Sequence, residues 1–167
     1  MSNSSKYNML NAKFNKYIYV TENNDRSGLN IVFDMNDFEP HKYKKCYGEI
    51  VEYLMYIYVE AMKKLENYSK NLLTMHIHVE TCTIRNFSIK LFKYLMNFFG
   101  EYIDSAGDNV IDYIYIHSKS KFFSIVYNMV KSQLTDSLRN RMVLIKVDSS
   151  NSVVYDQSNN ESRELSM

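Results

Sequence analysis

The sequence of 167 residues contains few residues that cross-link a chain or interrupt regular elements. Its two cysteines, Cys46 and Cys82, lie far apart and neither belongs to a C-x-x-C pair, so we expect two buried thiols in a reducing compartment. One proline and four glycines predict long helices and strands joined by few tight turns. No stretch reaches the ~18 consecutive apolar residues that a membrane-spanning helix requires. The polar N-terminus also lacks the apolar segment of a secretory signal, so we expect a cytoplasmic protein whose only contact with membranes would be peripheral.

An excess of charge of one sign is also missing. The chain has 20 basic and 19 acidic residues, which leaves a net charge of +1. Without a basic excess there is no electrostatic drive toward phosphate backbones, so we expect no nucleic-acid partner. Hydrophobic residues make up 46% of the chain, which is enough for one packed core that needs no disulfide or metal for stability.

The usual sequence signatures of enzymes are absent too. There is no glycine-rich phosphate loop, no G-x-S-x-G turn and no H-E-x-x-H helix. We therefore predict that the chain is not an enzyme and needs no cofactor.

Hydrophobic periodicity divides the chain into alternating strands and helices. Period-two stretches predict strands, and apolar residues spaced three and four apart predict helices. The predicted order is β-β-α-β-α-β-α-β, which indicates an α/β fold with a mainly parallel sheet and crossover helices. The predicted strands are residues 16–21, 29–35, 74–80, 110–116 and 142–147; the predicted helices are residues 43–67, 86–103 and 121–134, followed by a short helical turn at 135–140.

Residues 110–147 carry a pattern that can be compared with known families. A strand containing Tyr115 and Ile116 is followed by a helix led by Phe123, with Lys131 and Leu134 further along it, and then by an apolar strand that contains a lysine. This segment resembles the C-terminal signature of the CRAL-TRIO lipid-binding family, the fold of the yeast secretory phosphatidylinositol-transfer proteins. Residues 25–32 are similar to the hairpin of that family, with Asn30 where a proline often stands.

The resemblance implies a domain organisation. We expect a CRAL-TRIO-like α/β domain of two or three layers over residues 16–148, an N-terminal tail at 1–15 and a disordered C-terminal tail at 149–167. Both tails are rich in polar residues with little apolar periodicity.

The resemblance also implies a lipid site around the helix predicted at 121–134. In phosphoinositide-binding members a lysine at the position of Lys131 reaches the lipid phosphate, and the apolar face of this helix covers the cavity as a gate. Two alternatives stay open, namely a solvated lysine and ordinary packing of a crossover helix on a sheet. The expected apolar residues of the gate are Phe122, Phe123, Val126, Tyr127, Val130 and Leu134.

Polar residues are predicted on one face of two strands. His76, His78 and Glu80 alternate with Met75, Ile77 and Val79, so the two sets lie on opposite faces. Two imidazoles and a carboxylate could hold a metal, but neighbours on a single strand offer only part of a coordination shell, so we assign no metal. A polar sheet face turned toward a pocket, a loop or solvent is the favoured interpretation.

Tyrosines extend this set of candidates. Tyr113 and Tyr115, with His117, share a face of the strand at 110–116. Tyrosine has an apolar body and a polar tip, which suits a semi-polar cavity or an interface, although a tyrosine-rich core explains these residues equally well. The candidate ligand-binding residues outside the gate are therefore His76, His78, Tyr113 and Tyr115.

The sequence therefore favours a lipid-binding or lipid-transfer module that holds a hydrophobic or phospholipid ligand between the sheet and the gate-like helix. The alternative is a degenerate CRAL-TRIO-like scaffold that acts in protein–protein interaction without a bound lipid. The alternative rests on the polar strand face and on residues 104–109, which lack the Tyr-Pro-Glu turn that is common in the family.

Overall fold

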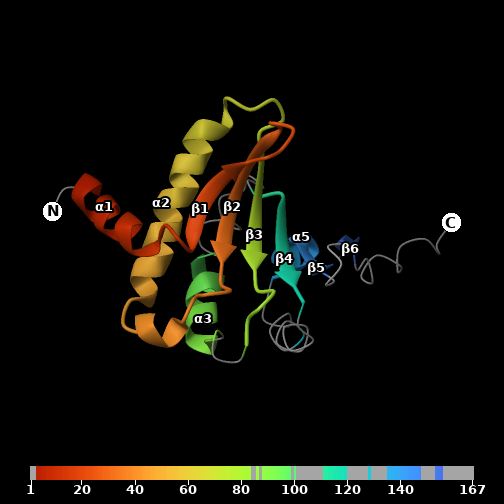
Figure 1. The fold of residues 1–167 in the computed structure, drawn as a ribbon. Helices are drawn as coiled ribbons and strands as arrows, with labels where there is room; N and C mark the ends of the chain where they lie inside the picture. The colour runs from red at the N-terminus through yellow and green to blue at the C-terminus, as the bar shows by residue number, and fades with distance from the viewer. Residues whose placement is uncertain are drawn as a thin grey trace.

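The computed structural model describes residues 3–83, 86, 88–98, 100, 111–119, 128, 135–147 and 153–155 of the chain. Strands and helices alternate along most of this length (Figure 1). The helices are α1 (Asn3–Phe14), η1 (Pro40–Tyr43), α2 (Tyr47–Leu65), α3 (Ile89–Phe98) and α5 (Asp136–Arg141); the strands are β1 (Ile18–Glu22), β2 (Gly28–Asp34), β3 (Leu72–His78), β4 (Tyr113–Ser118), β5 (Met142–Val147) and β6 (Val153–Tyr155).

Within this described part of the chain, the strands form one six-stranded sheet in sequence order, from β1 to β6. The three inner pairings, β2 with β3, β3 with β4 and β4 with β5, are parallel. The two outer pairings, β1 with β2 and β5 with β6, are antiparallel. The predicted α/β fold with a mainly parallel sheet is therefore confirmed.

The main hydrophobic core lies between one face of the sheet and the helices. Ile31, Met75 and Ile114 occupy one register row across β2, β3 and β4 and are fully buried. They belong to the same cluster as buried residues of α1, α2 and α3. Apolar residues spaced three and four apart in the helix predicted at 43–67 lie on the buried face of α2; among them are Ile50, Leu54, Ile57, Ala61 and Leu65.

β2 begins with a glycine, Gly28, just after the turn that follows β1. Asn23 N–H donates to the carbonyl of Gly28 over 3.0 Å, and Arg26 between them has a left-handed φ of 54°. A Cβ atom on Gly28 would lie 1.9 Å from the carbonyl oxygen of Leu72, the first residue of β3. Glycine therefore lets β2 and β3 begin their pairing at this point.

The prediction of an N-terminal tail over residues 1–15 is wrong, because Asn3–Phe14 is the helix α1. Leu10 and Phe14, four residues apart, are fully buried in the main core. The hydroxyl of Tyr53 donates to Oδ1 of Asn11 over 2.7 Å, which links α1 to α2. Leu10 and Phe14 therefore dock α1 on the core, and Tyr7 packs beside them against the rings of Tyr53 and Tyr56.

The C-terminal part also differs from the prediction. Residues Val153–Tyr155, expected in a disordered tail, form β6 and pair with β5. The helix predicted at 121–134 lies outside the described residues apart from Asn128, which is helical. The domain boundaries of 16–148 remain a prediction. Across the described residues, no helix is both long and apolar enough to cross a membrane.

Candidate functional site

Side chains of β2, β3 and β4 that point away from the main core form three rows across the sheet. Partners in register share a face, so each row can be taken directly from the strand pairing. The rows are Asn30–Thr74–Tyr113, Val32–His76–Tyr115 and Asp34–His78–His117. We call His76, His78, Tyr113, Tyr115 and His117 the histidine face.

The histidine face differs sharply in exposure from the face that the helices cover. Its three imidazoles and Tyr115 are half-buried, and the side chain of Tyr113 is 48% exposed. On the opposite face, Met75 of β3 and Val79 just beyond its end are buried, and Ile77 between them is half-buried. The predicted division of residues 75–80 between two faces is therefore confirmed.

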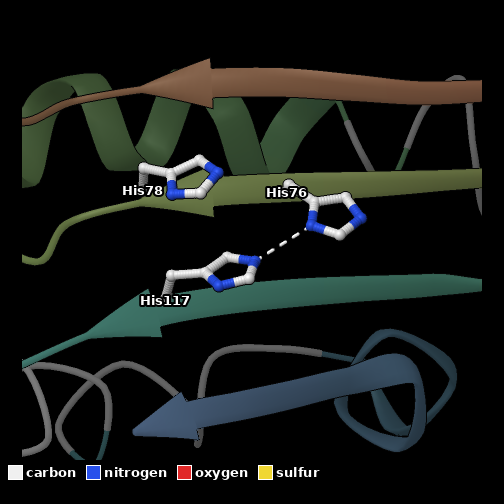
Figure 2. A group of neighbouring side chains, drawn as sticks. All are labelled: His76, His78 and His117. Carbon is white, nitrogen blue, oxygen red and sulfur yellow. Dashed lines mark hydrogen bonds between the residues drawn. The ribbon is translucent and has the colours of Figure 1, made fainter. Parts of the chain in front are cut away.

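The three imidazoles lie side by side near the carboxyl ends of β3 and β4 (Figure 2). His76 Nδ1 and His117 Nε2 are 2.9 Å apart and share a hydrogen bond. The rings of His78 and His117 stack, with centroids 4.4 Å apart and planes at 11°. The rings of His76 and His117 are 5.1 Å apart at 19°. Two histidines on one strand and one on the next thus form a single cluster.

The hydroxyl of Thr74 determines which nitrogen of His76 carries the proton. Thr74 Oγ1 donates its only hydrogen to Oδ1 of Asn30 over 2.7 Å. The same oxygen lies 3.2 Å from His76 Nε2, so it must accept a hydrogen from that nitrogen. His76 Nδ1 then carries the lone pair that accepts the hydrogen bond from His117 Nε2–H.

A carboxylate fixes His78 in a similar way. His78 Nδ1 donates to Oε1 of Glu80 over 2.7 Å, and Asn36 Nδ2 donates to the other oxygen of Glu80 over 2.9 Å. The hydrogen bond to Glu80 raises the pKa of His78 above its usual value. Burial alone would raise the pKa of Glu80, but the hydrogen bonds from His78 and Asn36 outweigh burial and hold this pKa at about 2.

His76 and His117 have the opposite electrostatic character. Burial, together with the nearby imidazoles of His117 and His78, lowers the pKa of His76 to about 4. Burial and the neighbouring His78 also lower the pKa of His117. Both rings are therefore uncharged at neutral pH, which agrees with their mutual hydrogen bond and stacking.

The structure brings together four candidates that the sequence singled out. The ring of Tyr115 lies 5.1 Å from that of His76 and 5.9 Å from that of Tyr113, and His78 lies on the same face. The remaining candidates lie outside the described residues; they are Phe122, Phe123, Val126, Tyr127, Val130, Lys131 and Leu134.

Sequence reasoning left His117 out of the candidate site. Its spacing from Tyr113 and Tyr115 placed it on their face, which was the available signal. Its contact with His76 depends on the register between β3 and β4, in which His78 pairs with His117. Sequence spacing alone does not contain that register.

A separate small cavity lies on the helix side of the molecule, bordered by α1, α2 and β1. Its volume is about 240 Å³, and its lining includes Tyr7, Asn11 and Tyr53. Pockets for drug-sized ligands are usually ~300–1,000 Å³, so this cavity is too small for a phospholipid. The histidine face is the stronger candidate site.

Comparison with known proteins agrees with this architecture. The family model of the CRAL/TRIO domain matches residues 13–161. The solved structure entitled "Crystal structure of Sfh5" superposes with a TM-score of 0.66 at 11% identity, over 80% of this chain and 49% of that chain. This likeness shows the fold alone, and the present chain spans about half the length of that protein. No curated protein matches the sequence. Because the family model matches most of the sequence, the chain belongs to the CRAL-TRIO domain family, whose members bind and transfer lipids and are generally not enzymes.

Proposed function

We propose that the chain is a lipid-binding or lipid-transfer module that holds a hydrophobic or phospholipid ligand between the histidine face and the helix predicted at residues 121–134. The observation that carries this proposal is the half-buried aromatic face across β3 and β4, on the side of the sheet opposite the main core. A sheet face of this kind provides one wall of a ligand site.

The chemistry of the face suits a ligand with both polar and apolar parts. Tyr113, Tyr115 and the stacked imidazoles offer ring surfaces for apolar contact and polar atoms for hydrogen bonding. Acyl chains buried against such a wall contribute ~0.8 kcal/mol per CH₂ group. In this proposal the glycerol or headgroup region contacts the imidazoles, and the acyl chains contact the apolar residues of the predicted gate.

The predicted gate supplies the opposite wall. Phe123, Val126 and Val130 would contact the acyl chains, and Lys131 would pair with a lipid phosphate, as the family resemblance implies. A phosphoinositide is then the expected headgroup class. We propose further that the module acts without catalysis in the cytoplasm and meets membranes only at their surface when it exchanges its ligand.

Native mass spectrometry of the chain, purified without detergent, tests this function. We expect a native mass above the denatured mass by several hundred daltons, and solvent extraction should identify the added species as a lipid. Lys131→Ala should reduce occupancy by phosphorylated lipids more than by neutral ones. A protein that is consistently empty and that takes up no labelled phospholipid from vesicles would overturn the proposal.

Protein interaction without a lipid is the second candidate function. The observation that favours it is the polarity of the histidine face, where ring nitrogens of His76, His78 and His117 all make hydrogen bonds. Under this alternative the native mass equals that of the bare chain or a whole multiple of it. The mass measurement therefore separates the two functions.

A further inference from the structure

The three clustered imidazoles also have the arrangement of a metal centre. One nitrogen from each of His76, His78 and His117 lies within 4.8 Å of the other two. Two nitrogens bound to one tetrahedral Zn²⁺ are ~3.3 Å apart when the Zn–N bonds are ~2.0–2.1 Å. The pair His76 Nδ1 and His117 Nε2, at 2.9 Å, is already close to that separation.

The contacts around the cluster orient the imidazoles for a metal. His78 uses Nδ1 to donate to Glu80, which leaves Nε2 as its nitrogen for coordination. His76 uses Nε2 to donate to Thr74, which leaves the lone pair of Nδ1 on the side of His117. A metal-binding histidine generally donates its other ring nitrogen to a carboxylate or another acceptor. Two of the three rings therefore already have their outer partners in place.

The outer partners are themselves held in place. Glu80 accepts a second hydrogen bond from Asn36 and its side chain is only 15% exposed. Thr74 donates to Asn30. This polar network reaches from β2 to β4 and fixes the orientations of two imidazoles. Solvated side chains on an ordinary protein surface do not need such a network.

We propose that His76, His78 and His117 form a binding site for a divalent transition metal such as Zn²⁺, with Glu80 and Thr74 as the outer partners that orient His78 and His76. Binding replaces the hydrogen bond between His76 and His117 with two metal–nitrogen bonds. The proton on His117 Nε2 moves to Nδ1 by tautomer exchange, and any proton on His78 Nε2 is released to water. Three protein ligands leave a fourth position for water or an anionic ligand. The metal site uses the same imidazoles that contact the headgroup region in the proposed lipid complex, but metal binding does not require a bound lipid.

Metal titration of the tag-free, chelator-treated full chain tests the site. Zn²⁺ binding is measured by equilibrium dialysis, and Co²⁺ is added separately because its visible spectrum reports coordination. The sequence offers a matched control, since it has four histidines and the fourth, His41, is exposed in η1. We expect one equivalent of metal for the wild type and for His41→Asn.

The cluster variants should behave differently. His76→Asn and His117→Asn should abolish stoichiometric binding, and Glu80→Gln should weaken it by about 10- to 100-fold, as loss of an outer partner generally does. A wild type that binds no metal would overturn the site, as would equal binding by the wild type and His76→Asn.

A second measurement keeps the proposal testable if a variant fails to fold. Co²⁺ added to the ¹⁵N-labelled wild type broadens amide signals near the ion. We expect loss of the signals of His76, His78 and His117 before those of η1. Broadening centred on His41, Cys46 or Cys82 instead would contradict the assignment.

Discussion

Gly28 shows how a single residue controls the start of the parallel sheet. The Gly28→Ala variant should lose about 2 kcal/mol or more of folding free energy, because the added Cβ would meet the Leu72 carbonyl at 1.9 Å and the backbone must move. Gly48→Ala in α2 is the matched control, since its Cβ would meet nothing within 4 Å. Helix propensity predicts a gain of about 0.5–1 kcal/mol there. Urea denaturation measures both; equal effects would contradict the close approach.

The lowered pKa of His76 predicts that acid reduces the stability of the folded protein. Its pKa falls from 6.5 to about 4 on folding, so between these values the unfolded chain binds a proton that the folded chain does not. Stability therefore decreases as the pH falls through this window. The lowered pKa of His117 acts in the same direction. His78 has a raised pKa, so in the lower part of this pH window it is protonated in both the folded and the unfolded chain. Glu80 begins to affect the pH dependence of stability only near its unfolded pKa of 4.5.

The expected loss of stability follows from the size of the pKa shift of His76. From pH 7 to pH 5, in the presence of a chelator, this residue should cost about 2 kcal/mol of stability, at ~1.4 kcal/mol per pKa unit. His76→Asn should lose correspondingly less stability over the same interval, and His41→Asn should behave like the wild type. Denaturant melts at the two pH values measure this difference. Identical pH dependence in wild type and His76→Asn would show that the imidazole is not shielded from protonation.

At the scale of the element, α1 is the helix whose contribution is least evident from the sequence. Leu10→Ala should cost about 2–5 kcal/mol, because this side chain is fully buried in the core shared with α2. Met9→Ala is the neighbouring control, since Met9 is 49% exposed, and should change stability by less than about 0.5 kcal/mol. Thermal or urea melts compare them. A negligible effect of Leu10→Ala would mean that α1 is not part of the cooperative fold.

Elements with a strong local pattern could be predicted from the sequence, and weakly patterned ones could not. The strand predicted at 142–147 is β5, and the alternation at 74–80 located β3 within two residues. In contrast, α1 has a polar sequence in which Leu10 and Phe14 carry the docking, and β6 exists through its pairing with β5. Both elements depend on tertiary contacts, which the hydrophobic periodicity of the sequence does not reveal.

The candidate site, too, could be predicted from the sequence only in part. Period two correctly placed His76 and His78 on one face, because that property belongs to a single strand. The contact of His117 with His76 required the parallel register of β3 and β4. Thr74 and Glu80 contact their histidines two residues away, but Asn30 and Asn36, which hold Thr74 and Glu80 in place, are distant in the sequence.

At the scale of the whole molecule, the two faces of the sheet have different roles. One face is sealed by α1, α2 and α3 in the main core. The other carries the imidazoles and tyrosines, and it is the proposed wall for a lipid. Each side of the sheet carries an exposed tyrosine at which a probe can be placed. Tyr113 on the histidine face is 48% exposed, and Tyr94 on α3 is 41% exposed.

The most direct test of the ligand-binding face uses a single tryptophan, since the chain contains none of its own. Tyr113→Trp and Tyr94→Trp are each loaded from vesicles that contain a phosphoinositide brominated in its acyl chains. The proteins are then separated from the vesicles and compared with samples loaded with the unbrominated lipid. We expect strong quenching of tryptophan fluorescence in Tyr113→Trp and none in Tyr94→Trp. Quenching in Tyr94→Trp alone, or in neither variant despite a bound lipid, would contradict the assignment of the histidine face.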